Sequence, residues 1–527
     1  MSKKIIFPAP TATTASMMNN RVRSTDFRTI VLPLLLILFL FTESPSLSAK
    51  GEEEMTFSPF STPLPIPEIL DSREENGYKI FELEAMEGEK EFFPGTATPT
   101  LGYNGDYLGP TIRVRTGESV RIRVKNTLKE TTTVHWHGAH IPADMDGGPH
   151  QQIIASETWE AVFQVKQEAA TLWYHPHMVP TTARQVYQGL AGLLLIEDEN
   201  SAALPIPKEY GKNDIPLVIQ ERDFFSDGTF SYGPSRPEIM HGYFGNVVLV
   251  NGAVQPYLTV EESTIRLRVL NGSNSSVLKL QLENQAPFLQ IASDGGFLEY
   301  PVESSGIVLS PGERAELLLD FSGYGPGEKL NFNAATITGD SYSILQFRTP
   351  DEGWNDSLMK TGTASDHESP VRELTFPDTA LRLNTIAPIP ESEAERQRRF
   401  VMSTMSPDGF LTINGKTMNM ERIDEYIPLG ATEIWRIENT GGRGGMGMMN
   451  TPHSFHVHDV QFQILSVNGQ PPPPHESGWK DTVLLWPGDI IRIIMRFEDY
   501  TGIYMYHCHL LEHEDAGMMG QFEVISR

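Results

Sequence analysis

Residues 507–519 read HCHLLEHEDAGMM and contain Cys508, the only cysteine of the 527-residue chain. His507 and His509 flank this cysteine, and His513 and Met518 follow shortly after it. Side chains alternate between the two faces of a β-strand, so the cysteine sulfur would point away from both neighbouring imidazoles. The stretch therefore predicts a strand in a β-rich fold, with a different set of polar side chains on each face.

Three further histidine clusters precede this stretch. They are His135 and His137 in HWHG, His175 and His177 in WYHPH, and His453, His456 and His458 in HSFHVH. Together with residues 507–513, the clusters hold ten of the 15 histidines. A His-x-His pair on a strand presents both imidazoles to one side. Four such pairs predict one interior site that receives eight imidazoles.

The remaining residues predict a second site. His453 differs in strand parity from His456 and His458, so it joins Cys508 and His513 in a two-histidine, one-cysteine set. Met518 adds a weak axial thioether, and these four ligands are typical of a blue-copper electron-transfer site. Zinc also accepts Cys and His, but it has no redox chemistry and gives no reason for the neighbouring eight-histidine site.

Each cluster also has an ordinary structural interpretation. A single His-x-His pair is common on surfaces and in cores, and a lone cysteine is usually a small buried hydrophobic residue. The run from His507 to Met518 is far more specific, and the four clusters together favour metal binding.

The rest of the chain has the pattern of an all-β protein. Short runs rich in Val, Ile, Leu and aromatic residues are separated by Gly, Pro and Asn, as in β-sandwiches and barrels. The clearest runs are residues 111–114, 120–124, 265–269, 317–321 and 490–497.

A repeat divides this β pattern into three. An Asn-Gly pair begins at Asn104, Asn251 and Asn414, and each is followed by an Arg-x-x-Asn run. The repeat agrees with a length prior of roughly 150 residues per domain. We therefore predict domains at residues 76–205, 206–355 and 356–527, preceded by an extended Pro-rich lead over residues 50–75.

The N-terminus resembles a secretory signal. Arginines precede an apolar stretch over residues 30–41, and small residues follow it. The stretch is shorter than the about 20 residues that a membrane-spanning helix needs, although an uncleaved signal anchor stays open. We expect residues 1–49 to direct export, with membrane attachment only if the signal is retained.

The formal net charge of −27 argues against nucleic acid as a partner, because phosphates require clustered Lys and Arg. Cationic substrates or metal ions would be attracted. The acidity also has a plainer interpretation, which is that it keeps the protein soluble.

With these motifs, residues 90–527 resemble the three-domain multicopper oxidases, a family that includes laccases, ascorbate oxidase, bilirubin oxidase and bacterial copper efflux oxidases. HCHLLEHEDAGMM looks closest to the branch of copper efflux oxidases and spore-coat laccases. The resemblance implies three consecutive cupredoxin-like Greek-key β-sandwich or barrel domains, the second without copper ligands, in a monomeric enzyme. It further implies one-electron oxidation of a small reductant, coupled to four-electron reduction of O2 to water.

The resemblance also assigns four copper ions. The type 1 copper would take His453, Cys508, His513 and Met518. The type 2 copper would take His135 and His456. One type 3 copper would take His137, His175 and His509, and the other His177, His458 and His507. Cys508 would pass electrons through its flanking histidines to the other three coppers.

Two carboxylates match family positions for proton delivery: Asp146 in the MDGGP turn, and Glu514 directly after His513. A positioned carboxylate can carry protons if its pKa suits the task. Asp146 has the alternative role of stabilising a glycine-rich turn.

The sequence leaves the substrate open between phenols, aromatic amines and low-valent metal ions. Met446, Met448 and Met449 precede His453, and their thioethers would suit Cu(I), or would pack against the site or line an aromatic pocket. The long Met- and His-rich insert of copper efflux oxidases is absent, and Met449 stands where their copper-docking acid is expected. Phenol oxidation is therefore the more general interpretation, with Cu(I) oxidation as the alternative.

Two other classes compete with an oxidase: a non-catalytic scaffold of the cell envelope, and a copper-sequestering protein. Retention of all ten histidines, Cys508 and Met518 argues against the scaffold. The Met-rich segment is the only feature that favours copper sequestration.

Overall fold

The computed structural model describes residues 58–337, 339–354, 379–406, 409–441 and 451–527. The proposed signal peptide and Met446, Met448 and Met449 lie outside these residues. Within the described part of the chain, no helix is both long and apolar enough to cross a bilayer.

Strands β1 to β9 form a first unit with two sheets, ordered β1-β2-β5-β7 with β3 beside β2, and β4-β9-β8-β6. The strands are Arg73–Glu75 (β1), Tyr78–Phe93 (β2), Thr96–Tyr103 (β3), Ile112–Arg115 (β4), Ser119–Asn126 (β5), His135–His137 (β6), Thr158–Gln164 (β7), Ala170–His175 (β8) and Gly192–Glu197 (β9). Buried aliphatic and aromatic side chains of both sheets share one core.

Strands β10 to β21 form a middle unit with sheets ordered β12-β11-β10-β14-β19-β16-β17 and β13-β21-β20-β15-β18. The strands are Asp214–Arg222 (β10), Val247–Val250 (β11), Ala253–Val254 (β12), Tyr257–Thr259 (β13), Thr264–Asn271 (β14), Leu278–Leu282 (β15), Phe288–Ser293 (β16), Gly296–Ser304 (β17), Ile307–Leu309 (β18), Arg314–Asp320 (β19), Lys329–Thr336 (β20) and Ser341–Arg348 (β21). A second large core fills this unit.

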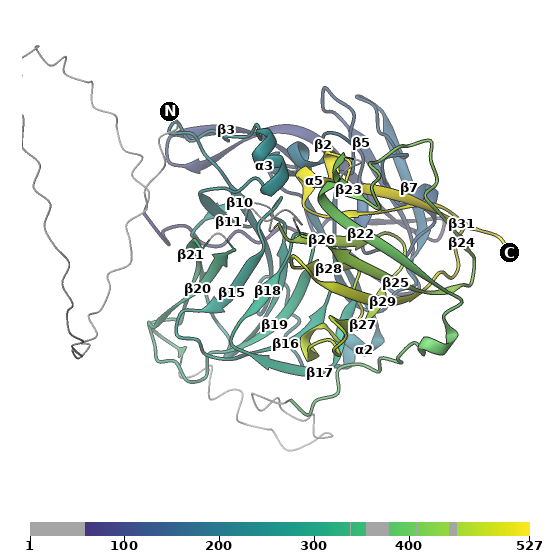
Figure 1. The fold of residues 1–527 in the computed structure, drawn as a ribbon. Helices are drawn as coiled ribbons and strands as arrows, with labels where there is room; N and C mark the ends of the chain where they lie inside the picture. Colours follow the sequence, from purple (N-terminus) through teal and green to yellow (C-terminus); the bar gives the residue numbers. More distant parts are fainter. Residues whose placement is uncertain (1–57, 338, 355–378, 407–408, 442–450) are drawn as a thin grey trace, which may run out of the picture.

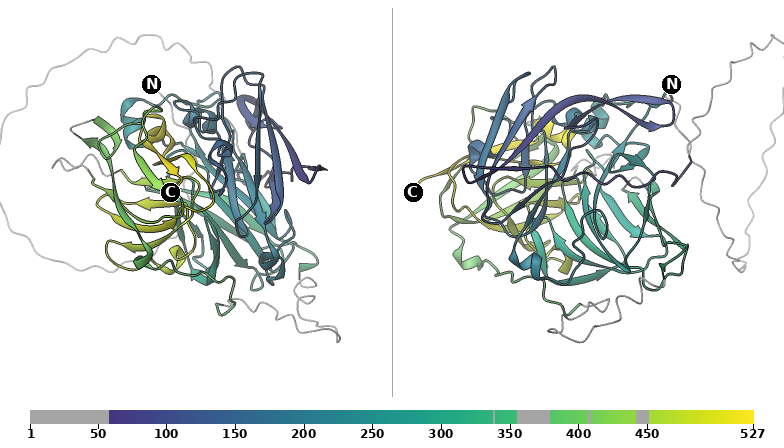
Figure 2. Two further views of the ribbon diagram at one scale, coloured as in Figure 1. Left: turned by 90° about the vertical axis from the view of Figure 1, so that its right-hand side faces the viewer. Right: turned by 180° about the vertical axis from the view of Figure 1, so that it is seen from behind.

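Strands β22 to β31 form a third unit with sheets ordered β23-β22-β25-β29-β27 and β24-β31-β30-β26-β28 around a third core. The strands are Arg396–Ser406 (β22), Gly409–Ile413 (β23), Glu425–Pro428 (β24), Thr432–Asn439 (β25), His453–Val457 (β26), Phe462–Val467 (β27), Thr482–Leu485 (β28), Ile490–Arg496 (β29), Gly502–Cys508 (β30) and Met519–Ile525 (β31). Figure 1 shows this green-to-yellow unit beside the teal middle unit, and the left view of Figure 2 shows it beside the purple-to-blue first unit.

Helices are short and lie between strands. They are Thr182–Gln188 (α1), Glu199–Ala203 (α2), Arg236–His241 (α3) and Leu511–Asp515 (α5), with 3-10 turns at Ala143–Met145 (η1), Glu391–Glu393 (η2) and Pro474–Glu476 (η3). The prediction of an all-β fold is therefore confirmed.

The sequence repeat corresponds to a structural repeat. Asn104, Asn251 and Asn414 all adopt positive φ, near 50°, as Asn tolerates better than most residues. The side-chain amides of these three asparagines form hydrogen bonds with the backbones of β2, β10 and β22, respectively. Each of those strands then pairs in parallel with the strand that carries the Arg-x-x-Asn run. The predicted domain limits themselves stay a prediction.

The described part of the Pro-rich lead is bound to the rest of the protein. Phe60 and Leu64 donate backbone hydrogen bonds to Gln255 and Tyr257, so this segment lies along the middle unit. Its last residues, Arg73–Glu75, form β1, because they pair antiparallel with β2.

Candidate metal centre

Two pairs of neighbouring strands carry the histidine clusters. In the first unit, β6 pairs antiparallel with β8, which places His135 opposite His175. In the third unit, β26 pairs antiparallel with β30, which places His456 opposite His507. The two pairs meet between the units, where the Nε2 atoms of His177 and His507 are 3.1 Å apart.

The eight predicted imidazoles form overlapping groups. Nitrogen atoms lie within 4.8 Å of one another in three sets: His135, His137 and His175; His135, His456 and His458; and His177, His458 and His507. The ring centroid of His509 lies 4.9 Å from that of His137 and 5.3 Å from that of His175. All eight side chains are buried, so the structure brings the whole predicted set together.

Burial favours the neutral form of several of these imidazoles. It lowers the pKa of His175, His177, His456 and His509 well below the ordinary value, and neighbouring imidazoles lower it further. The pKa of His458 falls to about 3 for the same reasons. A neutral imidazole has the nitrogen lone pair that a metal ligand needs.

Several imidazole nitrogens of the cluster have no hydrogen-bond partner among the described residues, as expected for atoms that bind a cation. Nε2 of His135 and of His456, and both ring nitrogens of His509, have no hydrogen-bond partner among the described residues although they are buried. A buried polar atom without a partner is costly. Imidazole suits copper, and the clustered nitrogens would satisfy their lone pairs on such an ion.

Asp146 and Glu514 both lie against this cluster. Oδ2 of Asp146 is 2.8 Å from Nδ1 of His458, and its Oδ1 is 3.5 Å from Nδ1 of His135. Burial opposes ionisation of Asp146, but these imidazoles outweigh it and hold the pKa of the carboxyl well below its usual value. The carboxylate thus contacts histidines and is more than a turn-stabilising group.

Glu514 is fully buried on α5 and touches a different part of the cluster. Its carboxylate oxygens lie 3.3 Å from Nδ1 of His177 and 3.2 Å from Nδ1 of His507. Asp146 and Glu514 therefore contact four of the eight imidazoles.

A third carboxylate, Asp481, was not predicted. Its Oδ1 is 3.1 Å from Nε2 of His137, and its backbone oxygen is 2.8 Å from Nδ1 of His456. The hydroxyl of Thr482 lies 3.1 Å from the same nitrogen of His137. The sequence contains 68 acidic residues and no histidine adjoins Asp481, so no local pattern distinguishes it.

The second site lies on the opposite face of β30, as strand parity predicts. Sγ of Cys508 is 3.5 Å from Nδ1 of His453 and 3.5 Å from Nδ1 of His513. Met518 is fully buried, and its backbone bonds both Cys508 and His513. Burial raises the pKa of the Cys508 thiol to about 12 and lowers that of His513 to about 4. A cation beside the sulfur would favour the thiolate instead.

The middle unit contributes an unexpected contact to this site. Nε2 of His513 donates to the backbone oxygen of Met240, at 3.3 Å, on α3. His241, the middle-unit histidine, lies 3.4 Å from Thr451 and takes no place in either cluster.

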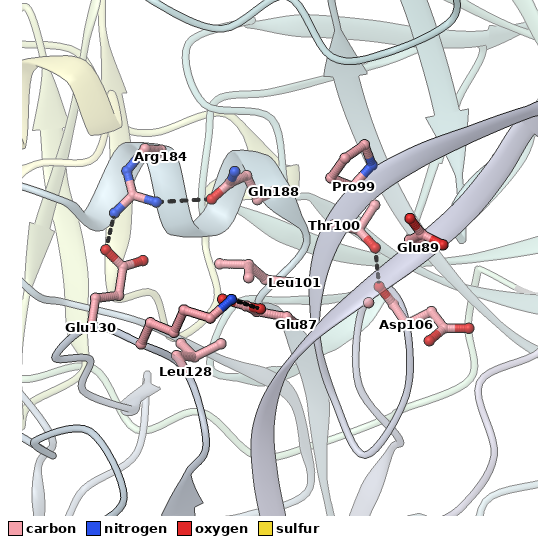
Figure 3. A pocket seen from close by; sticks show the side chains of 12 residues that line it. Glu87, Glu89, Pro99, Thr100, Leu101, Asp106, Leu128, Glu130, Arg184 and Gln188 are labelled. Carbon is pink, nitrogen blue, oxygen red and sulfur yellow. Dashed lines mark hydrogen bonds and ion pairs between the residues drawn. The ribbon is translucent and has the colours of Figure 1, made fainter.

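The first unit also has a pocket that lies away from both sites. Figure 3 shows this cavity of about 880 Å³, which contains none of the predicted site residues. Arg184 pairs there with Glu130 and Gln188, and Lys129 pairs with Glu87. These charged groups satisfy one another, so the pocket offers no evident chemistry.

Comparisons with known proteins agree with this geometry. Two models of the family described as multicopper oxidase match residues 85–201 and 391–527. The multicopper oxidase mco of Staphylococcus aureus is 40% identical over 479 residues, which cover 90% of this chain and 94% of the relative. The chain belongs to the multicopper oxidase family.

Other relatives of this multicopper oxidase have different names. The crystal structure of a laccase from Pediococcus acidilactici matches with a TM-score of 0.77 and 36% identity, covering 90% of this chain and 96% of that one. The cell division protein FtsP of Escherichia coli is 34% identical over 480 residues, covering 90% of this chain and 94% of the relative. Family, fold and site together identify a copper-dependent oxidoreductase that uses O2 as electron acceptor.

Proposed function

We propose that this multicopper oxidase holds four copper ions and oxidises phenols, aromatic amines or low-valent metal ions one electron at a time. His453, Cys508, His513 and Met518 would hold the type 1 copper, and His135 and His456 the type 2 copper. The type 3 coppers would take His137, His175 and His509, and His177, His458 and His507. When bound, these ions take single electrons from the reductant and deliver four of them to O2, which becomes water.

One observation carries the proposal: Cys508 belongs to one site while its covalent neighbours belong to the other. Its sulfur lies between His453 and His513, and His507 and His509 lie within the eight-histidine cluster. The main chain of β30 therefore provides a short covalent path for electrons between the two sites.

Asp146 and Glu514 are proposed to carry the protons that water formation requires. Each carboxylate contacts two imidazoles of the cluster, which places it close to where O2 would be reduced. The two groups reach the cluster from different units, which gives two separate proton sources.

Cu(I) is a second candidate substrate, favoured by a pocket beside the Cys508 site. Met178, Met418 and Met420 line this pocket of about 330 Å³ together with Asp515 and Gly517. Thioethers suit Cu(I) as soft ligands, and Gly517 directly precedes Met518. Met446, Met448 and Met449 do not enter this argument.

A scaffold without catalysis is the alternative suggested by the similarity to the cell division protein FtsP. The complete set of buried histidines around Cys508 supports the oxidase instead. Export as a monomer is proposed from the N-terminal sequence and the family resemblance, with membrane attachment only through an uncleaved signal.

The test combines copper content, colour and O2 uptake. We expect four coppers per chain, blue absorption from the thiolate bound to copper, and O2 consumption with at least one reductant. Fewer coppers without O2 uptake would refute the proposal. Comparing O2 consumption with Cu(I), Mn(II) and a simple phenol then identifies the substrate class.

A further inference from the structure

Arg314, on a unit that supplies no predicted ligand, reaches the histidine cluster through Asp481. Nη1 and Nη2 of Arg314 bond the two oxygens of Asp481 at 2.8 and 2.6 Å. Oδ1 of Asp481 also accepts from His137 and from the hydroxyl of Thr482. The arginine of the middle unit, the aspartate of the third and a histidine of the first thus form one buried chain of contacts.

The guanidinium of Arg314 has no free donor. Nε bonds the backbone oxygen of Thr171 in the first unit, Nη1 also bonds Gly312, and Nη2 also bonds the backbone oxygen of Asp294. All five N–H groups are therefore used, and the side chain is fully buried. An arginine held this way fixes the position of its carboxylate partner.

The first unit packs tightly on this arginine–aspartate pair. Gly138, which follows the HWH strand, has φ of +83°. A Cβ atom there would lie 2.5 Å from Oδ2 of Asp481 and 2.8 Å from Nη2 of Arg314. The junction therefore leaves little room for the pair to adopt another arrangement.

Asp481 determines which nitrogen of His137 is available to a metal. Because Nε2 of His137 donates its proton to Asp481, the lone pair is on Nδ1, which lies 3.4 Å from Nε2 of His175. In His135, His458 and His507 the proton is on Nδ1, because this atom contacts an oxygen of Asp146 or Cys508. Their lone pair is therefore on Nε2. His137 is thus oriented differently from these three imidazoles.

We propose that Arg314 is a positioning residue of the copper cluster: by fixing Asp481, it sets the tautomer and orientation of His137 and the placement of His456. This inference rests on the proposed ligand roles of those two histidines. It also gives the middle unit a task in the chemistry, although that unit supplies no ligand.

The main test replaces Arg314 with lysine, which keeps one charge but loses the two-point contact with Asp481. We expect Arg314→Lys to keep the blue absorption of the Cys508 site, because that site does not contact Asp481. Copper affinity at the type 2 and type 3 positions should fall about 10- to 100-fold, with weakening or loss of the type 2 electron paramagnetic resonance signal. O2 uptake should fall about as much.

Arg268→Lys is the matched control. Arg268 is also buried, bonds Thr171, and pairs with Asp214 and Glu316, but it has no contact with a histidine. We expect this variant to lose thermal stability and to keep its copper content and electron paramagnetic resonance spectrum. Loss of cluster copper from Arg268→Lys as large as from Arg314→Lys would overturn the inference.

Thr482→Val provides a milder test if Arg314→Lys does not fold. It removes the hydroxyl shared by Asp481, His137 and His456 with little change in volume. We expect the same spectroscopic change with a smaller loss of affinity. Wild-type copper affinity in both variants would refute the positioning role while leaving the proposed function intact, whereas a wild-type protein without cluster copper would refute both.

Discussion

At the scale of single residues, Cys508 and its two histidine neighbours connect the sites. Its sulfur approaches two imidazoles on one face of β30, while His507 and His509 project to the other. Among the described residues proposed as ligands, Cys508 alone has both of its covalent neighbours in the other site. Removing the sulfur should therefore separate electron acceptance from O2 chemistry.

We expect Cys508→Ser to abolish the blue colour and all turnover, because serine gives a poor ligand for the type 1 copper. The other three coppers should still bind, since the eight imidazoles do not depend on the sulfur. Copper analysis and absorption spectroscopy would check this. Appreciable turnover in the variant would contradict the electron path.

His140 gives a prediction about stability and pH. Burial opposes its charge, but Asp459, 2.9 Å away, and Asp499 raise the pKa of His140 to about 9. Because this pKa exceeds the unfolded value of 6.5, the stabilisation is present below pH 6.5 and is lost as the pH rises through 9.

The wild-type protein should therefore lose more thermal stability between pH 6.5 and 9 than His140→Asn does. The difference in unfolding free energy should be at most about 3 kcal/mol. Thermal unfolding of both proteins at several pH values measures it. Parallel pH profiles would show that the ion pair contributes nothing.

The division of the histidines between two faces could be predicted from the sequence because strand parity is a local property. His453 and His456 are separated by three positions, so they must face opposite sides wherever the strand lies. Asp481 and Arg314 could not be predicted, because their role depends on three units meeting. A single aspartate and a single arginine carry no pattern that reports such a contact.

At the scale of elements, the ends of short strands position the histidines of the two sites. β6 consists only of His135–His137, and the chain turns directly after it at Gly138, which has positive φ. α5 begins soon after β30 and turns Glu514 toward the cluster and His513 toward Cys508. The five apolar runs named in the sequence lie within a few residues of β4, β5, β14, β19 and β29, since an apolar run is a local feature. The sequence did not predict α5, which is only one turn long.

Gly138→Ala tests how tightly β6 is held. The added methyl would collide with Asp481 and Arg314, and alanine is also strained at positive φ, so we expect a loss of about 1–3 kcal/mol and weaker cluster copper. Thermal unfolding and copper analysis measure both effects.

Gly117→Ala is the control for Gly138→Ala, because Gly117 also has positive φ (+91°) but no atom within 4 Å of its added Cβ. It should lose stability through backbone strain while keeping all its copper. Equal copper loss in the two variants would contradict the collision argument.

At the scale of the whole molecule, the eight imidazoles join the first and third units. Copper bound among them would hold two units together in addition to the protein contacts between them. Ions that bind only the folded state stabilise it by mass action.

Removal of copper should therefore lower the unfolding temperature. Each ion stabilises the fold by about 4 kcal/mol when its free concentration is a thousandfold above its dissociation constant. Calorimetry of the holoprotein, the chelator-treated protein and the reconstituted protein measures the loss and its recovery. The same unfolding temperature in all three would rule out this linkage.

The position of the cluster between the first and last units has a consequence for biosynthesis. His177 and His507 touch although 330 residues separate them along the chain. A ribosome must therefore complete nearly the whole protein before both β26 and β30, which carry cluster histidines of the third unit, are present. A chain that stops before β26 carries only the four cluster histidines of the first unit, and any chain that stops before the end of β30 lacks Cys508 to supply electrons. Such fragments lack the covalent path that begins at Cys508, so we expect the chemistry only in finished molecules.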